Sequence, residues 1–497
     1  MYRNIKIQLA VVLCTALLAI SCLEDEGNYD YIKINEVAIA GIAKEYSVPR
    51  FDSFNIVPEL SFTQDNDTEE RYSYKWLAYK QAGLPIDPDK LTDLSNERDL
   101  TIDATLHPGM YTIYYTVTDT ETEVEWQYNF EVEIVNSIYE GWLLLNNIES
   151  ESRLDMISLL NEEYLTKHDI LGLAGSELVL SGKPGFVTVN RLEPNFYGIY
   201  VSTSGNGTTK IEPNTFSWNK AFDLSKEFGT SQPDGLEAQS IHEKSSGTSF
   251  CTVDGNIYYY YFSWRYKYST PINVIDGIPF EASPMIGVGN TRGSSIFYDN
   301  TNLRFTYFNG RGCYEMPPAA STLFNYNTGK DLVYLISNSY NGDGGKQTFA
   351  VLKDPIDGKQ YMARFNASTF VQYYYDEITA TDFDQATNIT INPEFGYLFY
   401  AVGSKVYEYD LYTKETIEML NKGSEEITLL KFHNFASSKY SEKFGNKLIV
   451  CSNNASKPQG TGGTFELYTV PAVNGQITLD ESYEGFGEIV SITYRER

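Results

Sequence analysis

The chain has 497 residues, and its 66 Asp and Glu residues against 38 Lys and Arg give a formal net charge of −28 at pH 7. Nucleic acid and anionic lipid surfaces repel such a chain, so neither is an expected partner. Tyr and Phe number 40 and 27, and aromatic and β-branched residues dominate the periodic segments, which predicts an all-β protein. The length allows about two to four domains.

The N-terminus has the features of a secretory signal. Arg3 and Lys6 form a positive region that precedes an apolar stretch, Ile7–Ile20. This stretch suits the core of a signal peptide and is short for a membrane span, which needs about 20 residues. We therefore predict a signal peptide over residues 1–21. No second apolar run approaches the length of a span, so we expect the rest of the chain to be water-soluble.

The residues around Cys22 refine this prediction. A small residue, Ser21, stands directly before Cys22 and resembles the end of a bacterial lipobox, where the cysteine thiol is acylated and becomes the new N-terminus. The acidic run Glu24–Glu26 resembles the export signal that sends Bacteroidetes lipoproteins to the outer face of the outer membrane. We predict lipidation of Cys22 followed by an acidic tether over 22–28. The alternative is an ordinary cleaved secretory signal, followed by a flexible acidic segment that carries no export signal.

Residues 29–136 have short alternating segments separated by turn signals, which predicts a β-sandwich. In the segment Glu125–Ile134, apolar and polar residues alternate with period two, as in a half-buried antiparallel strand. The predicted strands are Asn55–Phe62, Tyr72–Tyr79, Leu100–Asp103, Tyr111–Val117 and Glu125–Ile134.

Three features of this region carry a resemblance. Trp76 has the position of the core Trp of an Ig-like sandwich, and Gly109–Tyr111 resembles its tyrosine-corner strand. With Gly27–Tyr31 just after the predicted lipidation site, the region resembles the PKD-like domain of Bacteroidetes surface lipoproteins. The resemblance implies an Ig-like or PKD-like sandwich in which Trp76 anchors the core rather than a binding platform.

The sequence pattern of residues 139–497 differs from that of the sandwich region: it predicts many short strands, each preceded by Gly or by Asp/Asn-Gly. The pattern recurs loosely every 45–50 residues, which is the signature of four-stranded blades and predicts a β-propeller of about seven blades. We expect the C-terminal segment Gly487–Tyr494 to pair with the strand of Trp142 and close the ring. The alternative is a second and third sandwich. The segments that carry the pattern are Pro184–Val189, Asp254–Tyr260, Phe395–Tyr400 and Phe444–Val450.

Catalytic motifs are absent from the sequence. The four His residues have no metal-ligand spacing, and the chain has no HExxH, CxxC or GxSxG motif. Three cysteines, Cys251, Cys313 and Cys451, are widely spaced and are predicted to be small buried residues. We predict no catalytic residue, no metal site and no cofactor.

Aromatic clusters are the candidate ligand-binding residues. Exposed Tyr and Trp offer flat apolar area with a polar rim, which suits sugars and peptide backbones. The predicted ligand-binding residues are Tyr260, Trp264, Tyr266 and Tyr374. The alternative is that these side chains only pack between blades.

The resemblance implies a function. Similar proteins are accessory lipoproteins of nutrient importers built from a TonB-dependent porin and its lid lipoprotein, the SusC/SusD type. It implies a non-catalytic, surface-exposed outer-membrane lipoprotein that binds a glycan or a peptide beside such an importer. A propeller enzyme acting on glycans and a structural or adhesive surface protein are the alternatives, because propellers host all three functions.

Overall fold

The computed structural model describes residues 35–497 apart from 65–70, 83–89, 191–197, 246, 265, 291–292, 319–321 and 342–345. The predicted signal peptide, Cys22 and the acidic tether lie outside the described residues. Within the described part, no helix is long and apolar enough to span a bilayer. Two compact units are formed: one comprises the described residues to Tyr46 with Phe54–Ile102 and Met110–Glu133, the other Ser47–Ser53, Asp103–Gly109 and Ile134–Arg497.

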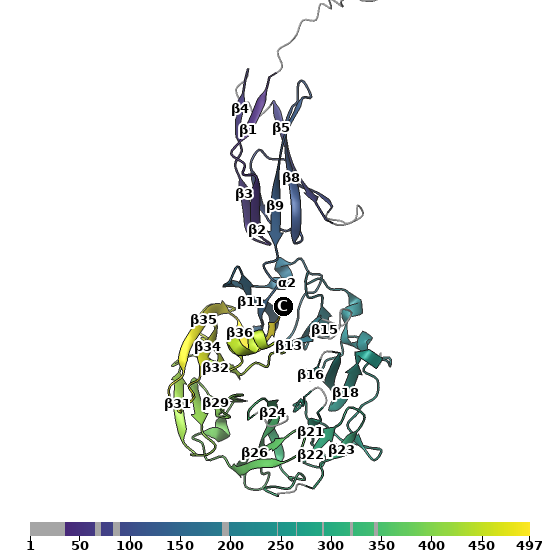
Figure 1. Cartoon of the computed structure of the whole chain (residues 1–497), viewed down its shortest axis with the longest axis vertical. Coiled ribbons are helices and arrows are strands. Elements are labelled where there is room, and N and C mark those ends of the chain that lie inside the picture. The colour runs from purple at the N-terminus through teal and green to yellow at the C-terminus, as the bar shows by residue number, and fades with distance from the viewer. Residues whose placement is uncertain are drawn as a thin grey trace, which may run out of the picture. The chain divides into compact units, whose positions relative to one another are not determined.

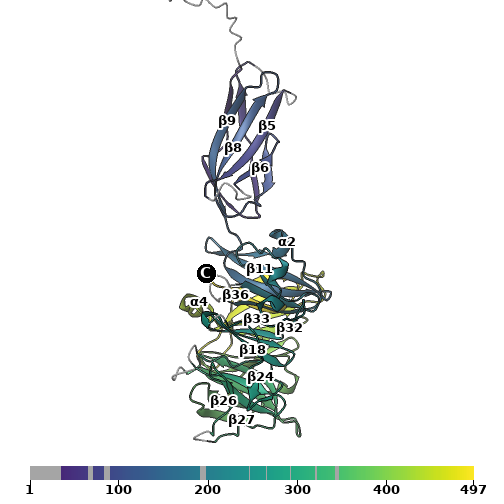
Figure 2. The same ribbon diagram turned by 90° about the vertical axis from the view of Figure 1, so that its right-hand side faces the viewer.

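The N-terminal strands form an antiparallel β-sandwich. Its largest sheet has the order β2-β9-β8-β5-β6, and two small sheets pair β1 with β4 and β3 with β7. Figure 2 shows β9, β8, β5 and β6. The strands are β1 (Val37–Ala40), β2 (Glu45–Pro49), β3 (Ser53–Ile56), β4 (Glu59–Phe62), β5 (Tyr72–Lys80), β6 (Leu91–Ser95), β7 (Leu100–Asp103), β8 (Gly109–Asp119) and β9 (Glu125–Val135).

Trp76 anchors the core of the sandwich, as the sequence predicts. It is fully buried and lies opposite Tyr115 in the β5–β8 register. Their ring centroids are 4.1 Å apart and stacked, and the indole Nε1 donates a hydrogen bond of 2.9 Å to the carbonyl of Glu97. Since the buried N–H has a partner, the Trp contributes its large apolar area without a polar penalty.

The second unit is a β-propeller. In its described residues, seven antiparallel sheets of three or four strands surround a central axis (Figure 1). The first blade is β10 (Gly141–Ile148), β11 (Glu151–Leu160), β12 (Glu163–Lys167) and β36 (Glu488–Arg495); the second β13 (Pro184–Asn190), β14 (Gly198–Thr203) and β15 (Gly207–Ile211); the third β16 (Ser240–Ser245), β17 (Thr248–Val253) and β18 (Asn256–Tyr261); the fourth β21 (Ser295–Asp299), β22 (Arg304–Phe308) and β23 (Cys313–Glu315).

The later blades are four-stranded. The fifth is β24 (Asp331–Asn338), β25 (Gln347–Lys353), β26 (Gln360–Asn366) and β27 (Gln372–Glu377); the sixth β28 (Asn388–Ile391), β29 (Leu398–Val402), β30 (Lys405–Tyr409) and β31 (Thr416–Asn421); the seventh β32 (Glu426–Lys431), β33 (Lys447–Asn453), β34 (Gly463–Thr469) and β35 (Thr478–Phe486). The remaining elements are the hairpin β19 (Val274–Ile275) and β20 (Ile278–Pro279), helices α2 (Ile170–Leu173) and α4 (Ser438–Phe444), and 3-10 turns η1 (Lys220–Phe222), η2 (Leu224–Glu227), η3 (Phe262–Trp264) and η4 (Phe383–Gln385).

The turn chemistry within a blade follows the sequence. Asp254 and Gly255 form the two-residue connection between β17 and β18, and both have positive φ, at 47° and 70°. A two-residue hairpin loop with both φ values positive is a type I′ turn, which favours Asp-Gly because Gly meets no steric cost there. The Asp-Gly signal used to predict strands in this region therefore corresponds to a tight hairpin.

The ring closes by pairing its last strand with its first. β36 is antiparallel to β10, with Trp142 opposite Tyr494, which confirms the predicted closure. The ring centroids of these two residues are 4.9 Å apart, and both belong to one buried cluster with Phe444 and Phe465. The first blade thus joins both ends of the propeller sequence, and its core holds the closed ring together.

Each blade places one strand nearest the axis. The inner strands are β13, β16, β24, β28, β32 and β36, and in the fourth blade the segment around Gly287, which bridges Ile296 of β21, takes this place. Figure 1 shows β13, β16, β24, β32 and β36 facing the middle of the ring. Because each blade is an antiparallel meander running outward from the axis, the inner strands share one direction and their C-terminal ends meet at one end of the channel.

Candidate functional site in the central channel

The inner strands enclose a cavity of about 680 Å³, here called the channel cavity. All seven blades contribute, mostly through the C-terminal parts of their inner strands, so the cavity occupies one end of the channel. Its lining combines aromatic, hydroxyl and charged side chains. The residues used below are Lys244, Lys346, Lys431, His242, His433, Glu243, Glu496, Ser337, Thr390, Tyr334, Phe435 and Tyr494.

Three lysines of the channel cavity come from three different blades. Lys244 lies near the end of β16, Lys346 directly precedes β25, and Lys431 is the last residue of β32. All three side chains are half-buried. Their blades are the third, fifth and seventh, so the lysines surround the axis rather than crowding one wall. By strand direction, all three belong to the same end of the channel.

None of these lysines has an ion pair with a carboxylate of the described residues. The Lys244 Nζ donates to the carbonyl of Gly293 at 2.8 Å, and the Lys431 Nζ donates to the carbonyl of Ile492 at 3.2 Å. Burial lowers the pKa of Lys244 and Lys346, and it lowers the pKa of Lys431 to about 8. The cause is removal of the ammonium from water without a compensating anion.

The two histidines of the cavity are held by backbone groups. His242 Nε2 donates to the carbonyl of Pro284 at 3.0 Å, and burial lowers its pKa, so the ring is neutral at pH 7. His433 Nε2 accepts from the backbone N–H of Tyr494 at 3.4 Å, and its ring packs 4.7 Å from Phe435. Both rings are fixed parts of the cavity wall.

Two carboxylates, Glu243 and Glu496, also line the cavity. The two oxygens of Glu496 accept hydrogen bonds from the backbone N–H groups of Ala436 and Ser437, at 2.9 and 2.8 Å, where the chain enters α4. This carboxylate is therefore already satisfied by backbone donors. With His242 neutral, the three lysines of the lining outnumber its two glutamates, although the whole chain carries −28.

The channel cavity offers binding chemistry more than reaction chemistry. No group of three or more His, Cys, Asp or Glu side chains with metal-binding geometry occurs in the described residues. Cys251, Cys313 and Cys451 are buried and form no disulfide, in line with their expected structural role, and burial raises the pKa of each thiol. The cavity's groups can donate hydrogen bonds and positive charge to a ligand.

The structure separates the aromatic residues singled out from the sequence. Tyr260 is buried in the core cluster with Tyr200 and Phe228, and Tyr266 is exposed. Tyr374 lies in another blade, half-buried, and its hydroxyl donates to the carbonyl of Leu411 at 2.7 Å. Trp264 lies in η3, and its side chain is outside the described part. Tyr260, Tyr266 and Tyr374 do not line the channel cavity, and ligand binding by the four predicted residues stays a prediction.

The channel lysines were missed from the sequence, although a signal exists. His242 and Lys244 are two residues apart at the end of one inner strand, and Lys431 and His433 have the same spacing at the end of another. Both members of each pair line the channel cavity. Half of the four histidines of the chain thus lie two residues from a lysine of the cavity.

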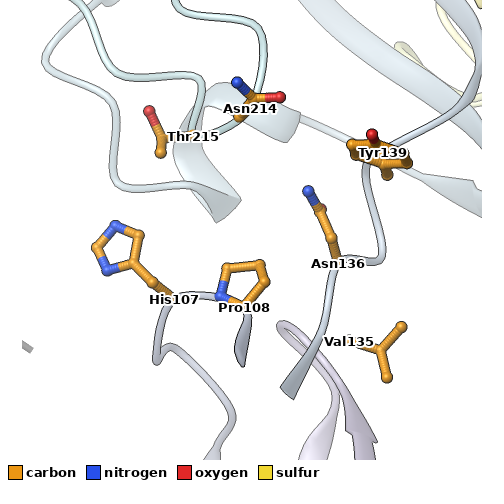
Figure 3. Close-up of a pocket in the computed structure, with 7 residues that line it drawn as sticks. All are labelled: His107, Pro108, Val135, Asn136, Tyr139, Asn214 and Thr215. Atoms are coloured by element: carbon orange, nitrogen blue, oxygen red, sulfur yellow. The ribbon is translucent and has the colours of Figure 1, made fainter. Parts of the chain in front are cut away.

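A second pocket is shallower and chemically sparser. It has a volume of about 530 Å³, and its lining includes His107, Asn136, Tyr139, Asn214 and Thr215 (Figure 3). Figure 3 shows these side chains spread around an open space rather than converging on one point. His107 and the Tyr139 phenol are its ionisable groups. The channel cavity is therefore the better candidate site.

The comparison with protein families agrees with the N-terminal sandwich. Residues 22–184 match the model of the PKD-like family, a range from the predicted lipidation site through the sandwich and β10–β12 to the first residue of β13. No curated protein sequence matches the chain.

Solved structures are similar at low sequence identity. A quinoprotein alcohol dehydrogenase-like protein from Bacteroides thetaiotaomicron is 11% identical, with 91% of this chain and 97% of that chain covered and a TM-score of 0.48. Dihydro-heme d1 dehydrogenase NirN, in complex with DHE, is 6% identical over 76% and 72%, with a TM-score of 0.39. The extracellular domain of a putative hybrid two component system from B. thetaiotaomicron is 9% identical over 62% and 35%, with a TM-score of 0.35. No residue role transfers at these identities.

Proposed function

We propose that this chain is a non-catalytic surface lipoprotein that binds a glycan or a peptide in the channel cavity of its propeller. The observation that carries the proposal is the convergence of all seven blades on one cavity of about 680 Å³. A concave site of this size, with apolar walls and a few placed polar groups, is typical of small-ligand sites. Aromatic side chains such as Tyr334, Phe435 and Tyr494 supply flat contact area beside the cations.

The sequence supports the location. Acyl chains on Cys22 would hold the protein on the outer membrane, because each buried CH₂ contributes about 0.8 kcal/mol and two or more chains anchor stably. The acidic run Glu24–Glu26 supports display on the outer face. In this proposal the sandwich acts as a spacer and docking module, and the propeller binds the ligand beside a TonB-dependent porin and its lid lipoprotein.

The enzyme alternative is not favoured by the cavity. Glycoside hydrolysis uses a pair of free carboxyl groups across the scissile bond. Of the cavity's Glu243 and Glu496, the second is engaged by two backbone N–H groups. A purely structural or adhesive role gives no reason for seven blades to leave a polar, aromatic-walled cavity on their axis.

Three experiments test the proposal. Metabolic labelling with an alkyne fatty acid should mark the wild-type chain and leave Cys22→Ala unmarked, and protease added to whole cells should cleave the wild type. A pull-down of the intact lipoprotein from outer membranes should recover a porin and lid pair. An unlabelled, protease-protected chain would contradict surface anchoring, and recovery of the lipoprotein alone would contradict the importer partnership.

A further inference from the structure

We propose that the channel cavity selects an anionic ligand, a small molecule or short saccharide with two or more carboxylate, sulfate or phosphate groups, which Lys244, Lys346 and Lys431 bind together. The inference rests on the proposed function, since it names the ligand class of the same cavity. It depends on three structural observations, which concern missing counter-charge, placement around the axis and the fit of the remaining walls.

The first observation is the missing counter-charge. Other largely buried lysines of the propeller pair with carboxylates: Lys210 lies 3.0 Å from Glu227, and Lys422 lies 2.7 Å from Glu466. The three channel lysines have no such partner in the described residues, in a chain with 66 acidic residues available. Burying an ammonium without an anion beside it costs desolvation free energy. A bound anion would offset that cost, which favours binding.

The second observation is placement. The lysines come from alternate blades, the third, fifth and seventh: Lys244 and Lys431 lie at the C-terminal ends of inner strands, and Lys346 precedes β25. All three line the same cavity, so one ligand with several negative groups can contact all of them there. A single monovalent anion would satisfy fewer of the ammoniums, so the arrangement favours at least two anionic groups on the ligand.

The third observation is the remainder of the wall. The Thr390 and Ser337 hydroxyls and the neutral His242 ring add polar contacts, and Tyr334, Phe435 and Tyr494 add apolar surface. Of the two acidic groups, Glu496 is occupied by backbone N–H donors, which leaves Glu243 as the other negative charge of the lining. A volume of about 680 Å³ admits a small molecule or a few sugar units and excludes a folded protein.

The test is isothermal titration calorimetry on the full propeller-containing chain with four probes. Trigalacturonate supplies carboxylates on a sugar, triglutamate supplies them on a peptide, inorganic sulfate supplies the bare anion, and a neutral galactose trisaccharide is matched in size. We expect trigalacturonate or triglutamate to bind, the neutral trisaccharide to bind at least tenfold more weakly, and affinity to fall as salt rises. Which of the two binds identifies the scaffold that carries the anions.

Charge-neutral variants locate the site. The triple variant K244Q/K346Q/K431Q should lose at least tenfold in affinity for the bound anion, whereas K244R/K346R/K431R should retain binding within about threefold, since Arg keeps the charge. Lys405→Gln is the matched control: it removes the same charge from an exposed pair with Glu418 and should leave affinity unchanged. If the Gln triple variant does not fold, each single variant should still weaken binding at least threefold.

The outcomes separate this inference from the proposed function. Equal binding of the neutral trisaccharide, or full affinity in the Gln variants, would overturn the anionic ligand and leave a binding role for the cavity intact. Binding of neither trigalacturonate nor triglutamate nor sulfate would also overturn it. Failure of Cys22 labelling or of the importer pull-down would instead contradict the proposed function and leave an anion-selective cavity standing.

Discussion

Lysines in two regions of the propeller experience opposite environments. Away from the channel, Lys210 and Lys422 each pair with a buried glutamate. Each glutamate also accepts a hydrogen bond from a Tyr hydroxyl, that of Tyr200 in one case and of Tyr468 in the other. In the channel, three lysines are half-buried without a carboxylate partner among the described residues. Charge matching stabilises the first group within the fold, while the second group bears an electrostatic cost that only something outside the described chain can offset.

The largest expected effect comes from breaking a matched pair. Glu227→Gln removes the charge that offsets Lys210, and it should lower the free energy of unfolding by about 3 kcal/mol, because it leaves a buried ammonium unpaired. Glu466→Gln should act in the same direction on Lys422. Urea denaturation measures both. The exposed Glu418→Gln is the control and should change stability by less than about 0.5 kcal/mol. A change at Glu227 as small as the control's would contradict the contrast between the regions.

A buried acid without a partner extends the comparison. Glu408 is buried in β30, neither of its oxygens has a hydrogen-bond partner within the described residues, and burial raises its pKa to about 7. Because this pKa lies above the ordinary glutamate value of 4.5, the contribution of Glu408 to stability is present below about pH 4.5 and is lost as pH rises through 7. Glu408→Gln should therefore be more stable than wild type at pH 8, by about 3 kcal/mol, and equal near pH 4. Thermal unfolding at both pH values checks this.

The channel lysines predict the opposite pH dependence. The folded pKa of Lys431, about 8, lies below the ordinary lysine value of 10.5, so the unfolded chain binds more protons between these values and stability rises with pH across that window. Lys431→Gln should raise the free energy of unfolding by about 1–2 kcal/mol at pH 7, and the gain should vanish above pH 10.5. Equal stability of variant and wild type at pH 7 would mean that burial of the charged Lys431 ammonium does not destabilise the fold.

The smallest effect is on binding. Deprotonation of Lys431 above pH 8 removes one of three cations facing the ligand, so affinity for a bound oligo-anion should fall about threefold between pH 7 and pH 9. The ligand carboxylates stay ionised over this range, and burial, which lowers the pKa of His242, keeps that ring neutral. Calorimetry at the two pH values measures the change, and the Lys431→Gln variant should show a flatter profile.

Much of the fold was predictable from local patterns. Three patterns depend only on residues that are close together in the sequence. They are the period-two alternation in Glu125–Ile134, the Asp254-Gly255 hairpin signal and the recurrence of short strands. Ring closure was also predictable, because a propeller needs its last strand to complete a blade. Helix α4 was not: the segment Phe444–Val450 suggested a strand beginning at its glycine, but Phe444 ends the helix and β33 begins at Lys447.

The candidate site was the least predictable part. Exposed aromatic residues attract attention in a sequence, yet Tyr260 belongs to the core between strands. Lysine is an ordinary surface residue, so composition alone does not distinguish the lysines that line the cavity. Their role as candidate ligand-binding residues depends on the lack of a nearby carboxylate in the closed ring. Only the three-dimensional arrangement determines that, since Lys244 and Lys431 are contributed by different blades far apart in the sequence.

Ring closure also constrains how the protein can be made. The Tyr494 hydroxyl donates to Glu140 at 3.0 Å across 354 residues of chain, so this contact must wait until the final strand is available. The entropy cost of closing such a loop rises only slowly with its length. The contacts that stabilise the closed ring nevertheless form only after all earlier blades have been ordered. Until then the β10 edge and the apolar face around Trp142 are open to pairing with other chains. The protein therefore depends on being kept apart from its copies while it folds, and a truncation before β36 should favour aggregation over a smaller ring.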